Sequence, residues 1–86
     1  MAYNINFTSY SKKQFSKLNK DTQKRIMAYL ENRVSINPHN FGKSLVGDKK
    51  GLWRYRVDDY RIICNINNNE LIVLVVDVGH RREIYE

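Results

Sequence analysis

The sequence predicts a single α+β domain over residues 1–86, in which one strand, two helices and three strands follow one another (β-α-α-β-β-β). Three observations predict this class. An 86-residue chain has room for one domain. Apolar residues recur with helical spacing between residues 9 and 37, and runs typical of strands lie before and after that stretch. We therefore expect two helices packed on one face of a small, mainly antiparallel four-stranded sheet.

The first half of the chain is predicted to form the first strand and both helices. Apolar and polar residues alternate over residues 3–8, which is typical of a strand with one buried face. The hydroxyls of Thr8, Ser9 and Ser11 can cap a helix over residues 9–19, with Gln14 as the second member of a capping box. Asp21 can cap a second helix, which Pro38 ends because the residue before a proline avoids the helical conformation. Apolar residues recur at every fourth position of that second helix: Ile26, Leu30 and Val34.

The second half is predicted to form a loop and three strands. Residues 37–51 contain three glycines and three lysines and are expected to be a loop. The strands are predicted at residues 52–57, 60–66 and 71–78. Asp58 and Asp59 form a two-residue turn, and three asparagines, which tolerate the left-handed conformation, form the next connection. The last strand is apolar on both faces, so it should lie inside the sheet.

The charge of the chain points to a polyanionic partner. Fifteen Lys and Arg residues against nine Asp and Glu give a net charge of +6, and the pI is near 9.6. A charge of this size in a small domain attracts nucleic acid, acidic protein or anionic membrane. Simple solubility is the alternative explanation. The helical cations carry less weight, because a solvated helix face shows the same pattern: Lys12, Lys13, Lys17, Lys20, Lys24 and Arg25.

Several kinds of chemistry are not expected. Cys64 is the single cysteine, so no internal disulfide can form, and its mid-strand position facing the helices predicts a buried, inert side chain. His39 and His80 have no Cys or carboxylate at ligand spacing, so we expect no metal and no cofactor. The N-terminus lacks the features of a signal peptide. The longest apolar run, residues 71–76, is far shorter than the ~20 residues of a membrane span. We therefore expect a cytoplasmic protein with no membrane partner.

Three arginines are predicted to share one face of the sheet. A two-residue turn at Asp58-Asp59 pairs the residues on either side of it, which places Arg56 directly across from Arg61. Because side chains two positions apart share a face, Arg54 joins them. Like charges directly opposite destabilise a sheet, and a bound anion would remove that cost. The alternative is a surface network in which carboxylates pair with the arginines: Asp58, Asp59 or Asp77.

This arginine face suits metal-free cleavage of RNA. RNA supplies its own nucleophile, the 2′-OH, so an enzyme needs a base, cationic donors for the phosphorane charge and an acid for the leaving oxygen. Arginine serves only the second need, because its pKa stays above ~12. The candidates for proton transfer are His80, Tyr85, Glu83 and nearby lysines. A surface histidine at a strand end is the alternative explanation for His80.

Four segments, in this order and spacing, resemble the RelE branch of the RelE/ParE toxins. They are KSLVG at 43–47, LWRYRV at 52–57, DYRII at 59–63 and VGHRREIY at 78–85. The predicted element order agrees, so the resemblance covers nearly the whole chain. It implies the toxin of a type II toxin–antitoxin system, which cuts mRNA in the ribosomal A site. It also implies neutralisation by a co-expressed, RelB-like antitoxin.

The resemblance also implies roles for individual residues. The strand positions that act on the scissile phosphate match Arg54, Arg56 and Arg61. Arg61 and Arg81 would stabilise charge in the transition state, and Tyr85 would stack on or orient the nucleotide. Relatives carry lysine where Arg54 and Arg56 stand, and a lysine can act as a base whereas an arginine hardly can. This departure implies that proton transfer passes to His80 or becomes less efficient. Four more basic residues are expected to bind RNA: Lys43, Lys49, Lys50 and Arg82.

Two other functions remain open at this point. A ParE-like inhibitor of DNA gyrase has the same fold and does not cut RNA. The combination of Arg54, Arg56, His80 and Tyr85 argues against it, because an inhibitor of a protein needs no cluster that grips phosphate. A double-stranded-RNA-binding module is the second alternative. Such modules run α-β-β-β-α, whereas here both predicted helices precede the three strands.

Overall fold

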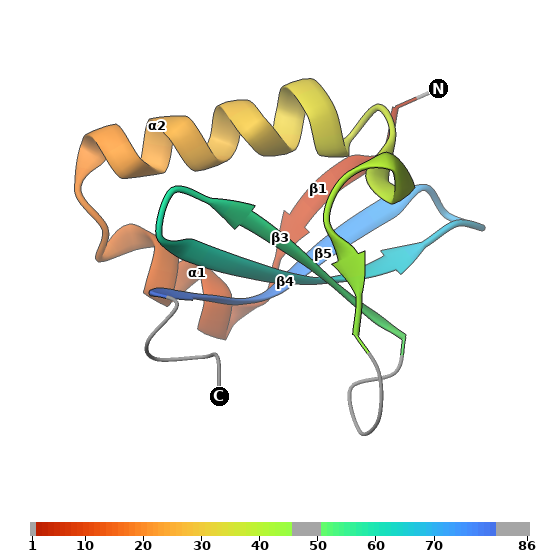
Figure 1. Ribbon diagram of the computed structural model, residues 1–86. Coiled ribbons are helices and arrows are strands. Elements are labelled where there is room, and N and C mark those ends of the chain that lie inside the picture. Colours follow the sequence, from red (N-terminus) through yellow and green to blue (C-terminus); the bar gives the residue numbers. More distant parts are fainter. Residues whose placement is uncertain (1, 46–50, 81–86) are drawn as a thin grey trace.

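A computed structural model describes residues 2–45 and 51–80 of the chain. The described elements form two helices and a five-stranded mixed sheet with the strand order β1-β5-β4-β3-β2 (Figure 1). In chain order they are β1 (Asn4–Phe7), α1 (Ser9–Ser16), α2 (Lys20–Tyr29), η1 (Leu30–Val34), η2 (Pro38–Asn40), β2 (Lys43–Ser44), β3 (Leu52–Val57), β4 (Tyr60–Asn67) and β5 (Ile72–His80). The α+β class is confirmed.

The predicted count of four strands is wrong by one. The loop expected over residues 37–51 contains a short helical turn, η2, and the two-residue strand β2, which pairs antiparallel with β3. Among the described strand pairs, β1 and β5 are parallel and the other three are antiparallel, so the sheet is mainly antiparallel as expected. β5 lies between β1 and β4, which its apolar residues on both faces predicted.

The cap of α1 is one of the predicted candidates, whereas the end of α1 and the cap of α2 differ from the prediction. Thr8 caps α1 by accepting a hydrogen bond from the Ser11 backbone N–H, and α1 ends at Ser16 rather than at residue 19. Asn19, and not Asp21, caps α2: its side chain accepts from the Thr22 backbone N–H at 2.8 Å. Both side chains satisfy an N–H that the first turn leaves without a helical partner.

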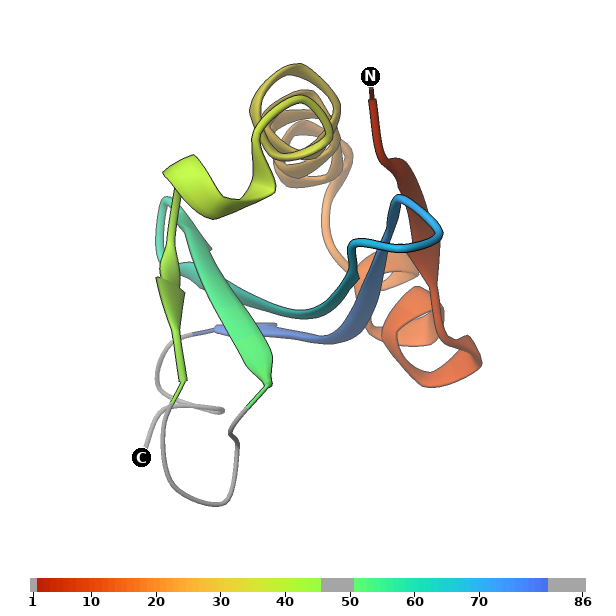
Figure 2. The same cartoon turned by 90° about the vertical axis from the view of Figure 1, so that its right-hand side faces the viewer.

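The core lies between α2 and the curved sheet beneath it (Figure 2). The predicted apolar stripe of the second helix is confirmed, because Ile26, Leu30 and Val34 are all fully buried. The stripe continues past Tyr29 through η1, a widened π-helical turn. From the sheet, the fully buried residues are Tyr55, Ile62, Cys64, Val73 and Val75. Burial raises the pKa of the Cys64 thiol, which keeps it protonated and inert.

Helix α1 lies beside β5, past the point where β1 ends. The Ser11 hydroxyl donates to the Val75 carbonyl at 2.6 Å. The Gln14 side chain accepts from the Val78 backbone N–H and donates to the Asp77 carboxylate, both at 2.8 Å. Gln14 was expected to complete a capping box, and instead its amide takes the place of a neighbouring strand at this edge. The end of β5 is thereby fixed against α1.

The two connections between the last three strands behave differently. The turn at Asp58-Asp59 has two residues as predicted, with Asp58 in the left-handed region at φ 55°. In the connection from β4 to β5 the left-handed residue is Leu71, at φ 56°, and not one of the asparagines. Within the described residues no helix is long and apolar enough to cross a membrane.

Candidate functional site

The predicted register of the β3–β4 hairpin is confirmed. Val57 pairs with Tyr60, Arg56 pairs with Arg61, and Arg54 pairs with Ile63. Arg54, Arg56 and Arg61 therefore project from the same face of the sheet. On its other side Arg61 pairs with Gly79 of β5, which has no side chain. Arg61 therefore has a charged neighbour, Arg56, on the β3 side and a residue without a side chain on the β5 side.

These arginines line one cavity together with a residue of β2. The cavity has a volume of about 230 Å³ and is lined by Gly42, Lys43, Arg54, Arg56 and Arg61. We call it the arginine cavity. Lys43 enters it because β2 pairs Lys43 with Arg54. Four cationic side chains thus converge on a space large enough for a phosphate group, and one of them, Arg61, is only 6% exposed.

Gly42 makes this arrangement possible, and the sequence analysis missed it. Its φ is +66°, a left-handed conformation that side chains with a Cβ rarely adopt. A Cβ at this position would overlap the Arg54 carbonyl oxygen and would lie 2.7 Å from the Tyr55 ring. Glycine therefore lets the chain run closely against β3, and that approach brings Lys43 opposite Arg54. The one available signal was a glycine directly before a lysine in a glycine-rich loop.

Two of the carboxylates in the alternative network are engaged elsewhere. Asp58 pairs with Arg25 of α2, with Nε and Oδ2 at 3.0 Å. Asp77 accepts a hydrogen bond from Gln14. Both carboxylates therefore have a partner outside the arginine cavity. Arg56, on the cavity rim, is exposed and forms no ion pair within the described residues.

The structure does not bring His80 into the arginine cavity. His80 is the last residue of β5 and pairs with Tyr60, with the two rings in edge contact at 5.6 Å between centroids. The register places this pair on the face of Val57, opposite to the face of Arg61. His80 lines a separate cavity of about 400 Å³ with Gln14, Lys17 and Tyr60. His80 and the arginines thus lie on the two sides of one strand end.

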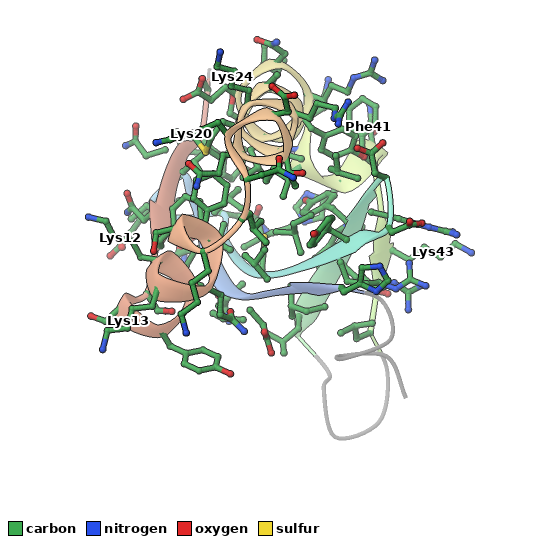
Figure 3. The ribbon with its side chains drawn as sticks, turned by 90° about the vertical axis from the view of Figure 1, so that its left-hand side faces the viewer. Lys12, Lys13, Lys20, Lys24, Phe41 and Lys43 are labelled. Carbon is green, nitrogen blue, oxygen red and sulfur yellow. The ribbon has the colours of Figure 1, made fainter. Side chains whose placement is uncertain are left out.

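The lysines of the helices form a separate basic surface. Lys12 and Lys13 of α1 and Lys20 and Lys24 of α2 point outward, away from Lys43 of the arginine cavity (Figure 3). All four are exposed, as a solvated helix face requires. The other candidates of the sequence analysis lie outside the described residues: Lys49, Lys50, Arg81, Arg82, Glu83 and Tyr85. Within the described part, no three His, Cys, Asp or Glu side chains gather to hold a metal ion.

Comparison with known proteins identifies what this fold is similar to. Residues 5–85 match the family described as the ParE toxin of the type II toxin–antitoxin system parDE. The chain is 26% identical over 85 residues to the toxin RelG of Mycobacterium tuberculosis, which covers 99% of this chain and 98% of that protein.

Solved structures show the same architecture. The toxin–antitoxin complex RelBE2 from M. tuberculosis contains a chain that superimposes with a TM-score of 0.88 at 23% identity, over 94% of this chain and 100% of that one. The isolated RelE toxin of E. coli gives a TM-score of 0.79 at 23% identity, over 98% and 92% of the two chains. The RelE–RelB complex of Pyrococcus horikoshii gives 0.69 at 22% identity, over 96% and 99%.

Proposed function

The chain belongs to the RelE/ParE family of type II toxin–antitoxin toxins, and from this premise we propose that it is an endoribonuclease that cuts mRNA in the ribosomal A site. Cleavage would stop translation in the cytoplasm. The observation that carries the proposal is the arginine cavity, in which Lys43, Arg54, Arg56 and Arg61 converge. A toxin directed at a protein target has no need for four cations around one phosphate-sized space.

The arginine cavity supports the proposal through electrostatics. Attack of the 2′-OH on the scissile phosphate places additional negative charge on the phosphorane oxygens, and donors fixed before the reaction stabilise that charge most effectively. Arg61 is 6% exposed, so its charge is poorly screened by water. Arg54 and Arg56 present guanidinium groups that can bind phosphate oxygens with two parallel hydrogen bonds. In this proposal Arg61 and Arg81 stabilise the transition state, and Lys43, Lys49, Lys50 and Arg82 hold the RNA backbone.

Proton transfer requires a residue other than arginine. We assign it to His80 or Tyr85. The register places His80 on the opposite face from Arg61, so its participation requires the RNA to bend around the end of β5. Tyr85 would stack on or orient the nucleotide. Metal is not required in this scheme, because the nucleophile belongs to the RNA itself.

The proposed regulator is a RelB-like antitoxin. Support comes from similar chains whose structures were solved as RelE–RelB complexes, including those of M. tuberculosis and P. horikoshii. A gyrase-directed toxin is the second candidate, because the matching family carries the ParE name. The arginine cavity favours the nuclease over this candidate.

Primer extension on a defined mRNA tests the proposal, with purified protein in the presence and absence of programmed ribosomes. We expect cuts at A-site codons that depend on the ribosome. Cuts on naked RNA as well would show a nuclease that does not depend on the ribosome. If neither reaction gives cuts and the protein inhibits DNA supercoiling by gyrase in a parallel assay, the protein is a gyrase inhibitor and the nuclease proposal is wrong.

A further inference from the structure

The proposed cleavage of RNA needs two proton transfers, one at each end of the reacting phosphate. A base takes the proton of the attacking 2′-OH, and an acid gives a proton to the 5′-oxygen that leaves. Attack and departure occur roughly in line, so the two groups must lie on opposite sides of the phosphate. The residues to which proton transfer is assigned, His80 and Tyr85, both lie at the C-terminal end of the sequence. A second group is therefore needed on the other side.

Lys43 is the residue of the arginine cavity that can supply this proton. In the described part of the chain, the charged side chains that line the cavity are three arginines and Lys43. A guanidinium does not give up a proton in proteins, whereas a lysine ammonium carries three protons and can release one. The 5′-oxygen is a poor leaving group unless it is protonated, so a proton donor placed beside it lowers the barrier.

The order of the strands places Lys43 on the required side. β2 and β5 lie on opposite sides of the β3–β4 hairpin (Figure 1). A phosphate held between the cross-strand neighbours Arg56 and Arg61 would therefore have β2 on one side and β5 on the other. Lys43 pairs with Arg54 and lines the cavity from the β2 side. The end of β5 lies on the opposite side, where Gly79 pairs with Arg61.

The backbone on both sides of Lys43 is tied to β3. Before it, the Phe41 carbonyl accepts a hydrogen bond from Trp53 Nε1–H at 2.6 Å. After it, the Leu45 N–H donates to the Leu52 carbonyl at 2.9 Å. The Lys43 side chain itself is exposed, so it is accessible to RNA and can regain a proton from solvent. A fixed backbone helps a proton donor, because the donor must reach the same oxygen in each reaction.

We propose that Lys43 is the general acid that protonates the 5′-oxygen of the scissile phosphate. This inference rests on the proposed function. As the bond between the 2′-oxygen and phosphorus forms, the bond between phosphorus and the 5′-oxygen breaks, and a proton passes from Lys43 Nζ to that oxygen. The 2′-OH proton goes to the group at the β5 end, and the products are a 2′,3′-cyclic phosphate and a 5′-hydroxyl. The neutral amine then takes up a proton from solvent, and the base releases one to it.

A substrate with sulfur in place of the 5′-oxygen separates a proton donor from a cation that only binds phosphate. A thiolate leaves without being protonated, because the pKa of a thiol is only about 8.5. The measurement is the single-turnover rate of cleavage on programmed ribosomes, with protein in excess, for an mRNA that carries oxygen or sulfur at the cut position.

Lys43→Arg keeps the positive charge and removes the transferable proton. We expect this variant to cleave the oxygen substrate about 100-fold or more slowly than wild type, which is the size of a general-acid contribution. It should cleave the sulfur substrate at a rate within about threefold of wild type, because that leaving group needs no proton.

Two other variants serve as controls. Arg61→Gln should be slow on both substrates, because the phosphorane charge develops with either leaving atom. Lys12→Arg makes the same exchange at an exposed position on α1 and should match wild type on both substrates. The urea midpoint of Lys43→Arg should equal that of wild type, because the side chain is exposed, and this measurement verifies that the variant is folded.

Three results would overturn the proposal. Cleavage of the oxygen substrate by Lys43→Arg at the wild-type rate would mean that Lys43 contributes only its charge. Equal losses on the oxygen and sulfur substrates would mean that Lys43 positions the RNA and does not give the proton. If the wild-type protein cuts neither substrate, the proposed function itself is wrong, and the inference falls with it.

Discussion

Arg56 and Arg61 lie directly opposite each other on adjacent strands, where two positive charges destabilise the hairpin. Arg61 is buried and Arg56 is exposed, so the pair presents one buried and one exposed cation to the same cavity. A bound anion between the two guanidinium groups would remove this repulsion. The pairing therefore favours the proposed role in phosphate binding.

Replacement of Arg56 should therefore separate stability from activity. We expect Arg56→Gln to raise the free energy of unfolding by a few tenths of a kcal/mol, about the size of a cross-strand charge repulsion. The same change should lower the rate of RNA cleavage. Urea unfolding and primer extension measure the two effects, with Lys12→Gln as the control for loss of one positive charge. An Arg56→Gln protein that is less stable than wild type would show that the repulsion is compensated within the fold.

Gly42 and Gly51 offer a matched pair of substitutions. Both have positive φ values, +66° and +95°, but an added Cβ would strike the β3 backbone at Gly42 and would contact nothing within 4 Å at Gly51. Gly51→Ala should cost about 1 kcal/mol of stability from backbone strain alone. Gly42→Ala should cost about 1–3 kcal/mol more, because the overlap with Arg54 must be relieved. Urea unfolding gives both values, and equal losses would mean that β2 does not pack against β3 as described.

At the scale of elements, the start of α2 depends on Asn19, which the sequence analysis did not assign as its cap. Asn19 and Asp21 are both good capping residues, and they are two positions apart, which is within the usual uncertainty of a helix end. The structure gives the cap to Asn19 and leaves Asp21 in the first turn. There Asp21 retains a favourable interaction with the helix dipole.

Substitution at the two positions tests this assignment. Asn19→Ala should lower the free energy of unfolding by about 1 kcal/mol, because the Thr22 N–H loses its acceptor. Asp21→Asn should cost only about 0.3 kcal/mol, since it removes a charge near the helix N-terminus and no cap. Thermal or urea unfolding measures the stability lost in each variant. A larger loss in Asp21→Asn than in Asn19→Ala would show that Asp21 is the cap.

The β3–β4 hairpin was predictable, whereas β2 and the end of β5 were not. A two-residue turn fixes which residues face each other, so the pairing of Arg56 with Arg61 followed from local sequence. β2 has only two residues and therefore no periodicity to detect. The position of His80 depends on where β5 ends, and strand ends are poorly marked when Gln14, more than sixty residues earlier in the chain, supplies the hydrogen bonds.

At the scale of the whole molecule, two buried acidic groups should make the fold sensitive to alkaline pH. Burial raises the pKa of the Tyr55 phenol, with smaller contributions from Cys64, Tyr29 and Tyr3, and burial also raises the pKa of the Cys64 thiol. Tyr55 remains protonated and donates to the Pro38 carbonyl at 2.6 Å. In the unfolded chain these groups release their protons near their ordinary pKa values, about 8.5 for Cys and 10 for Tyr.

The folded state therefore binds more protons than the unfolded state at high pH. The stability contributed by these groups is complete below about pH 8.5 and falls as the pH rises, by up to about 1.4 kcal/mol per pH unit for each group above its unfolded pKa. Urea midpoints measured from pH 7 to pH 11 should decrease through this range. Tyr55→Phe should flatten the decrease above pH 10, although it loses a hydrogen bond. An unchanged slope in that variant would exclude Tyr55 as its source.

The cavity between α2 and β3, which Arg25, Arg33 and Arg56 line, shows why part of the surface escapes sequence reasoning. Arg25 looked like a member of a solvated helix face and Arg33 was not singled out, and the relation of both to Arg56 arises only when α2 packs against β3. No local period connects residues more than twenty positions apart. Part of the arginine cavity could be predicted from the sequence, because its three arginines lie on one hairpin. Lys43 was expected to bind RNA, but its pairing with Arg54 and the role of Gly42 were not predicted.

The central claim is that Arg61 acts on the phosphate of an A-site codon. The most direct measurement is the single-turnover rate of mRNA cleavage on programmed ribosomes, with protein in excess, for Arg61→Gln and for Lys12→Gln. We predict a loss of about 100-fold or more for Arg61→Gln, the size expected when one preorganised donor is removed from a transition state. We predict a rate within about twofold of wild type for Lys12→Gln. Cleavage by Arg61→Gln at the wild-type rate would contradict the claim.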